Sequence, residues 1–247
     1  MILRRLTKHV NEQNWFAVWL DLGVVIIGVI AGLQVSNWNE ERQNNLKGQN
    51  YLERIADELE QDIRFFDGVL SSNNRSIEDA RFLLETINNE NLVRENPTKF
   101  ITAFTISGAS IVVNVSNNTI EEIKYSGNLE LIADEELRNK IADYYDFIEV
   151  SQTFSHLRIS AETEYQKRNV GILDPDQFSQ FGRSVTYNEE DAVLVYERFI
   201  ENKKLHGWLP VIMGSKLSTI GFSTRSQNNA KELVAMIRGD GKAEASQ

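Results

Sequence analysis

Residues Phe16 to Val35 form an almost entirely apolar stretch, and this stretch restricts what the chain can fold into more than any other feature. Only Asp21 and Gln34 within it are strongly polar. An α-helix rises about 1.5 Å per residue, so a stretch of this length spans roughly 30 Å, the thickness of the hydrocarbon core of a bilayer. We therefore expect a single transmembrane helix at residues 16–38, since no later stretch has the necessary length.

Tryptophans stand at both ends of the apolar stretch. Trp15 and Trp19 lie at its first boundary and Trp38 lies at its second. Indole rings prefer the headgroup region, so these three residues are the expected interface anchors. A buried helix of a soluble domain is usually interrupted sooner by a charge and seldom carries such tryptophans, which favours a membrane span over a core helix.

The charges on the two sides of the stretch predict its orientation. Arg4, Arg5 and Lys8 precede the stretch and are opposed only by Glu12, whereas residues 40–42, two glutamates and an arginine, open the flank that follows. Short cytoplasmic segments carry an excess of Lys and Arg. We therefore expect residues 1–15 to form a short cytoplasmic tail and the bulk of the chain to be extracytoplasmic.

A cleavable signal peptide is the main alternative to a permanent anchor. Such a peptide has a shorter apolar region of about 7 to 15 residues, followed by a cleavage site of small residues. The nearest such site, Val29 to Ala31, lies inside the apolar stretch. We therefore interpret the stretch as an uncleaved signal-anchor and keep cleavage as the alternative.

Two features inside the stretch concern its partners. Gly28 and Gly32 form a G-x-x-x-G pair, which lets two helix backbones approach closely in lipid and favours a homodimer or a partner membrane protein. Asp21 is an ionisable group in an apolar segment, which is costly and suggests pairing with a partner's cation or a proton path. Alternatively, Asp21 lies about 7 Å from the end of the span, where its carboxylate reaches interfacial water.

Composition excludes several classes of protein. The 247 residues include 26 Lys and Arg against 36 Asp and Glu, a formal net charge of −10, and no cysteine. Nucleic acid is not an expected partner, because binding to phosphates needs clustered positive charge. Disulfides and thiolate metal sites are ruled out. The histidines are isolated in sequence and no phosphate-binding loop is present, so we expect no metal, no cofactor and no enzymatic activity.

Helical periodicity dominates the remainder of the chain. Apolar positions between Leu52 and Leu70 step by three and four residues, which predicts a helix that continues the span. The polar residues 71–75 predict a turn, with Ser76 capping a second helix. We expect an all-α fold: a single N-terminal transmembrane helix, an extracytoplasmic antiparallel helical bundle at residues 39–238, and a disordered tail at 239–247.

Three later segments have predicted roles. The stretch 100–115 is ambiguous, because its first half suits a helix and its β-branched second half suits extended chain. Asn117 or Asn118 is the expected N-cap of a short helix that ends at a left-handed Gly127. A long helix is expected at 134–169, and its shifting apolar stripe indicates two neighbours or a bend.

Two stretches of sequence resemble a known family. The end of the span, VIIGVIAGLQVSNWNEER, and the later TIEEIKYSGNLELIADEELRNKIADYY are similar to the domain of unknown function 6090, a group of uncharacterised bacterial proteins with one span and a helical extracytoplasmic domain. Trp38, Asn39 and Glu40 match directly, and Asp21 stands where the family often has Glu. The second motif is fitted by Ile123, Gly127, Leu129, Ile132 and Leu137. The resemblance implies a bacterial inner-membrane protein with a periplasmic bulk, and no reaction.

The second motif has a physical interpretation as a corner between two helices. Ile120 and Ile123 would pack inward, and Gly127 would take a backbone conformation that is costly for other residues. The apolar residues from Leu129 to Ile132 would then plug the core. We interpret the corner as structural, with a ligand-binding corner as the alternative.

Two functions remain open at this point. The first is a membrane-anchored interaction or scaffold protein that dimerises through its transmembrane helix, with the lipid bilayer as its other partner. The alternative is an extracytoplasmic sensor of a small molecule that signals through a partner membrane protein. For the sensor, an aromatic-lined pocket could form from Tyr144, Phe147, Phe154 and Tyr165.

Overall fold

A computed structural model of the chain describes residues 15–180, 183 and 185–244. The side chains at 15, 17–18, 156–158 and 240–244 lie outside this description, as does the whole of the predicted cytoplasmic tail before Trp15. The described residues are helical in large part and form no β-strand, so the predicted all-α class is confirmed.

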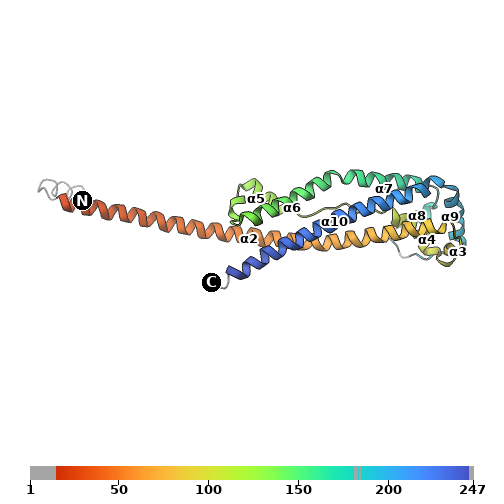
Figure 1. Ribbon diagram of the computed structural model, residues 1–247, viewed down its shortest axis with the longest axis horizontal. Coiled ribbons are helices and arrows are strands. Elements are labelled where there is room, and N and C mark those ends of the chain that lie inside the picture. Colours follow the sequence, from red (N-terminus) through yellow and green to blue (C-terminus); the bar gives the residue numbers. More distant parts are fainter. Residues whose placement is uncertain (1–14, 181–182, 184, 245–247) are drawn as a thin grey trace.

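One helix joins the apolar stretch to the bundle without a break. Helix α2 spans Trp15–Thr86, and its 72 residues correspond to a length of about 108 Å at the usual rise. Its first half projects from the molecule on its own, as Figure 1 shows. Gly48 is the first buried residue along it, and the second half forms one leg of the bundle.

The bundle has four legs that alternate in direction (Figure 1). The second half of α2 runs outward, and α4 (Pro97–Ser107) returns beside it, followed by residues 109–117 without regular secondary structure. A third leg runs outward again as α6 (Glu135–Thr153) and α7 (Ser155–Asn169). The last leg, α10 (Lys203–Glu244), returns along α2, with which it makes the most extensive contact in the fold.

Short elements close the two ends of the bundle. Helix α5 (Asn118–Ser126) and the 3-10 turn η1 (Leu129–Leu131) lie at the end nearest the projecting helix (Figure 1). Helices α3 (Asn91–Glu95), α8 (Pro175–Ser179) and α9 (Glu189–Glu201) lie at the far end.

The apolar core consists of two clusters. The near cluster forms around Ile55, Leu59 and Ile141, and the far cluster around Phe100, Phe104 and Phe199. Buried polar side chains, including a lysine and a glutamate, belong to neither cluster. The bundle therefore has a polar component in its interior, which the section on the candidate site describes.

The predicted turn at residues 71–75 is wrong, because α2 is continuous through it. Asn73 donates its side-chain amide to the carbonyl of Val69 at 2.7 Å, and the hydroxyl of Ser76 donates to the carbonyl of Ser72 at 3.1 Å. Polar side chains that end helices elsewhere can bond back to the preceding turn when they are packed inside. Ser76 therefore lies within the helix and caps nothing.

Three other boundaries differ from the prediction. The long helix expected at 134–169 is divided at Phe154, which agrees with the bend inferred from its shifting stripe. Asn117 occupies the N-cap position of α5, but its side chain makes no capping bond. Helix α10 continues to Glu244, so most of the tail expected to be disordered is helical, and 245–247 lie outside the described residues.

Gly48 allows a close approach between α2 and the turn η1. A Cβ atom at this position would lie 2.1 Å from the carbonyl oxygen of Leu131 in η1. We expect Gly48→Ala to lower the free energy of unfolding by about 1–3 kcal/mol, because the helix or the turn must shift. Urea unfolding of the detergent-solubilised chain measures this change.

Gly68 on the same helix provides the control. Nothing lies within 4 Å of a Cβ atom added there. Gly68→Ala should therefore be neutral or stabilising by up to about 1 kcal/mol, from helix propensity alone. Equal effects of the two substitutions would contradict the close approach at Gly48.

Candidate functional site

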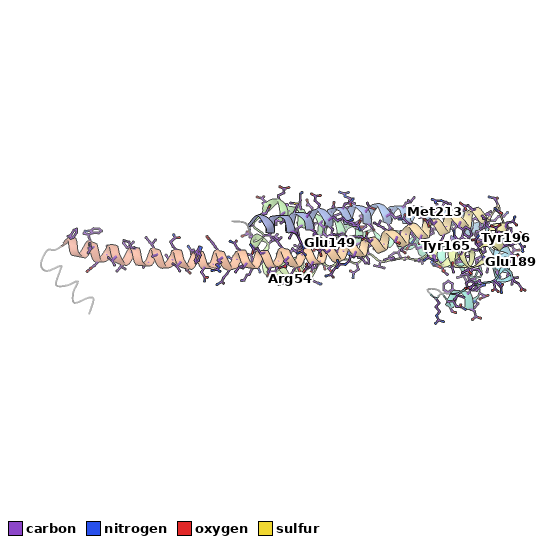
Figure 2. All side chains as sticks on the ribbon, turned by 90° about the horizontal axis from the view of Figure 1, so that it is seen from below. Arg54, Glu149, Tyr165, Glu189, Tyr196 and Met213 are labelled. Atoms are coloured by element: carbon purple, nitrogen blue, oxygen red, sulfur yellow. The ribbon has the colours of Figure 1, made fainter. Side chains whose placement is uncertain are left out.

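The first candidate site is the projecting part of α2. One helix of the described chain is long and apolar enough to span a membrane, with a mean hydropathy of 1.9 over 18 residues, none of it buried within the molecule. Figure 2 shows its side chains radiating from the helix with no other element beside them. Trp19 and Trp38 are 69% and 63% exposed, and the side chain of Trp15 lies outside the described part of the structure.

Asp21 and the two span glycines share one face of this helix. Residues three or four positions apart lie on the same side of an α-helix. Asp21, Val25, Gly28, Gly32 and Val35 follow this spacing without interruption, and we call them the α2 seam. Nothing in the chain lies within 4 Å of a Cβ atom added at Gly28 or Gly32, so packing within the molecule does not require glycine there.

The second candidate site, the corner between α5 and α6, is built into the core. Gly127 has φ 69° and ψ 20°, the left-handed conformation predicted for it, and the N–H of Asn128 donates to the carbonyl of Ile123 at 3.0 Å. Ile123, Ile132 and Leu137 are buried in the near cluster, and Leu129 packs against it. Each of these family-motif residues therefore has a packing or capping role.

The third candidate site is a group of polar contacts around the segment 109–117, and the sequence did not predict it. The segment 109–117 runs along the bundle without a neighbouring strand, so its backbone groups need other partners. Ile106 accepts a hydrogen bond from Ser76, and Ser116 donates one to Asp62. Ser76 and Asp62 are about 21 Å apart along α2. A helix over the ten residues from Ile106 to Ser116 would be too short to join them. The segment is therefore extended, which resolves the ambiguity of the sequence.

A buried ion pair lies beside the start of this segment. Lys216 of α10 and Glu162 of α7 are paired, and their side chains are 1% and 7% exposed. Lys216 also donates to the carbonyl oxygen of Ala109, and Ser110 donates its hydroxyl to Glu162. Lys216 and Glu162 thus supply hydrogen-bond partners to the extended segment inside the bundle: the first to the carbonyl of Ala109 and the second to the hydroxyl of Ser110.

Two carboxylates of α2 hold the other end of the segment. Asp62 accepts hydrogen bonds from the backbone N–H of Ser116 at 3.1 Å and from the hydroxyl of Tyr144 at 3.0 Å. Glu58 accepts from the backbone N–H of Thr119 at 3.2 Å and from its hydroxyl at 2.8 Å. Glu58 therefore caps α5 from outside, which explains why the side chain of Asn117 makes no capping bond.

Burial makes Asp62 the most perturbed carboxyl group of this site. Desolvation raises the pKa of Asp62 to about 6, and the hydrogen bonds from Ser116 and Tyr144 only partly oppose this rise. The nearby charge of Glu58 raises it further. The fold therefore binds a proton at Asp62 more tightly than an unfolded chain does.

The proposed aromatic pocket does not exist. Tyr144 belongs to the near cluster and Tyr165 to the far cluster. Phe147 stacks on Phe222, with ring centroids 5.2 Å apart, and Phe154 is 52% exposed. The four rings therefore occupy separate places and line no common pocket.

The described part of the chain contains no group of three or more His, Asp or Glu side chains that could hold a metal ion. His206 contacts the carbonyl oxygen of Phe199 at 2.8 Å and packs against its ring. His156 has its side chain outside the description, and His9 lies before the first described residue.

Comparison with known proteins identifies no relative. The chain matches no profile of a protein family, no curated protein and no solved structure. The resemblance to the domain of unknown function 6090 therefore rests on the two stretches of sequence quoted above.

The buried ion pair gives a test of the polar site. Lys216→Met should lower the free energy of unfolding by about 3–5 kcal/mol, because it leaves Glu162 charged and buried without its partner. Adding Glu162→Leu should recover much of this loss. A double-mutant cycle from urea unfolding measures the coupling between the two residues.

The exposed pair of Lys140 and Glu232 is the matched control on α6 and α10. Lys140→Met should change stability much less, since exposed pairs contribute little. Additive effects of the two substitutions at 216 and 162 would contradict the pairing.

Asp62 should make stability depend on pH. Its folded pKa of about 6 lies above the ordinary value of 3.8. The unfolded chain therefore loses this proton first, and stability contributed by Asp62 falls as pH rises from about 4 to about 6. Asp62→Asn should remove this fall and leave the variant more stable near pH 7, by an amount on the order of 2–3 kcal/mol.

The measurement is urea unfolding between pH 4 and pH 8. Asp146→Asn, at an exposed position on α6, is the control and should leave the pH profile as it is in the unsubstituted chain. An unchanged profile in Asp62→Asn would show that the carboxyl group titrates normally.

Proposed function

We propose that the chain is a membrane-anchored scaffold protein that dimerises through the α2 seam. The observation that carries the proposal is an apolar helix with none of its membrane-length window buried in the molecule. Soluble proteins rarely leave so large a contiguous apolar surface uncovered. A bilayer around residues 16–35 removes this surface from water.

The seam supports a second copy of the chain as the partner. In lipid, helices associate by close packing because no hydrophobic force acts between them, and glycines allow that packing. Gly28 and Gly32 have no packing partner within the chain. Asp21 lies on the same face, so a parallel pair brings two of these carboxyl groups close to each other.

The polar helix between the span and the bundle also supports pairing. Residues 36–47 are helical and are exposed or partly exposed, with none of them buried. Isolated helices of this length are marginal in water. A second copy alongside stabilises this part of α2 and holds two bundles at a fixed height above the membrane.

The proposed orientation puts the N-terminus in the cytoplasm and the bundle in the periplasm of a bacterial cell. Its support is the excess of positive charge before the span. An acidic helical bundle at the end of a rigid helix suits a role in holding a partner protein. Asp62, Glu162 and Lys216 have partners inside the bundle, which leaves the surfaces of the bundle for that interaction.

Cysteine cross-linking in membranes tests the dimer. The chain has no native cysteine, so single cysteines report on chosen faces. Val35→Cys, on the seam, should form a disulfide-linked dimer with several-fold higher yield than Ile30→Cys, which lies on the opposite side of the helix. Gly28→Ile together with Gly32→Ile should lower the yield from Val35→Cys, because the larger side chains separate the backbones.

Gly23→Ile is the matched control, since it changes a span glycine off the seam. It should leave the yield unchanged. Equal yields from Val35→Cys and Ile30→Cys would contradict pairing through the seam, and recovery of the whole protein in the soluble fraction would contradict the anchor.

A further inference from the structure

A shallow depression at the far end of the bundle carries an excess of positive charge. It has a volume of about 580 Å³ and lies between the turn that follows α7 and the junction of α9 with α10. Its lining includes three cations, Arg198, Lys203 and Lys204, and one acid, Glu201. We call this surface, formed by residues 170–172 and 198–204, the basic tip. It stands out in a chain whose net charge is −10.

Hydrogen bonds hold the parts of the basic tip in place. Arg198 donates from Nη1 to the carbonyl of Ile172 at 3.1 Å, which ties α9 to the turn. Asn202 donates its side-chain amide to the carbonyl of Arg168 at 3.1 Å, which ties the junction to the end of α7. Gly171 has φ 90°, a conformation that favours glycine, so the turn itself is well defined. The backbone of this surface is therefore formed before any partner binds.

The two lysines of the basic tip have no carboxylate partner in the described part of the chain, and both are exposed. Toward the other end of the same helix, Arg238 is paired with Asp57 and Glu60 at 2.8 Å and 3.2 Å. Exposed charges without an intramolecular partner attract a partner of opposite charge and steer its approach. The lysines are therefore available to an acidic partner.

The basic tip also has an apolar component. Val170, in the turn beside Gly171, is 82% exposed. The aliphatic stems of the neighbouring lysines can cover apolar groups while their charged ends stay in water. The surface therefore suits a partner that combines several carboxylates with an apolar side chain.

The position of the basic tip separates it from the membrane of the proposed anchor. Helix α2 runs about 70 Å from Trp38 to its end at Thr86, and the basic tip lies at that far end of the bundle (Figure 1). Exposed charges are screened within about 8 Å at physiological ionic strength. The lipid headgroups beside Trp38 are therefore out of reach of these cations.

The opposite end of α9 favours a short acidic segment over a long polyanion. Its first turn carries Glu189, Glu190 and Asp191, about 20 Å along the helix from the basic tip. A nucleic acid that extends across the far end would be repelled by these carboxylates, whereas a short peptide would contact the basic tip alone.

We propose that the basic tip binds a short acidic segment of a partner protein. Its carboxylates contact Arg198, Lys203 and Lys204, and its apolar side chain lies against Val170. This inference rests on the proposed scaffold function, because it names the class of partner that the bundle holds.

The test is fluorescence anisotropy with the full chain in a neutral detergent. The probes are a labelled heptapeptide of six Asp and Glu residues around a central Leu, its counterpart with Asn and Gln, and an oligothymidylate of equal charge. The acidic peptide should bind at least tenfold more tightly than the amide peptide, and more tightly than the oligonucleotide. Its affinity should fall several-fold from about 50 mM to about 300 mM NaCl, because salt screens exposed charges.

Lysine variants locate the binding. Lys203→Gln and Lys204→Gln should each weaken the acidic peptide about two- to fivefold, as expected for exposed charge pairs, and the double variant about tenfold. Arg64→Gln is the control, because it makes the same change in charge at an exposed position of α2 outside the basic tip. It should leave the affinity unchanged. Circular dichroism checks that each variant folds.

Four results would overturn the proposal. They are no binding of the acidic peptide at the lower salt concentration, equal binding of the amide peptide, tighter binding of the oligonucleotide, and equal losses in Arg64→Gln and the double lysine variant. Cross-linking through the α2 seam is measured without any peptide. A failure of the basic tip is therefore distinguishable from a failure of the dimer.

Discussion

The apolar surface at the start of α2 is the constraint on which the rest of the account depends. No other element covers it, although the helix continues without a break into a well-packed bundle. Leaving that surface in water opposes folding in proportion to its area. A lipid environment removes this penalty, and we propose that the glycines and the acid on one face then determine how two such helices meet.

Inside the bundle, a second constraint explains the buried charges. The return leg changes from helix α4 to extended chain at residue 108, which leaves backbone groups without helical or sheet partners. Lys216, Asp62 and Glu58 supply these partners from the surrounding helices. These three ionisable residues are therefore part of the architecture of the bundle.

The sequence predicted the helical class, the long apolar N-terminal helix and the Gly127 corner, because each depends on local periodicity or on one backbone conformation. It failed where tertiary contacts overrode local preference. Asn73 and Ser76 favour a turn in isolation, but here they bond back along α2. The pairing of Lys216 with Glu162 joins residues 54 positions apart, and Gly48 is needed only because Leu131 approaches it. Neither relation leaves a pattern in a single sequence.

Spin-label accessibility along α2 in lipid vesicles is the most direct test of the central claim. Single cysteines from residue 16 to residue 47 would carry the label, and collision rates with oxygen and with a water-soluble nickel complex would be measured. We predict high oxygen and low nickel accessibility at 16–35, lower oxygen accessibility on the seam face, and a change to nickel accessibility beyond Trp38. Nickel accessibility throughout residues 16–35 would contradict a membrane-embedded helix.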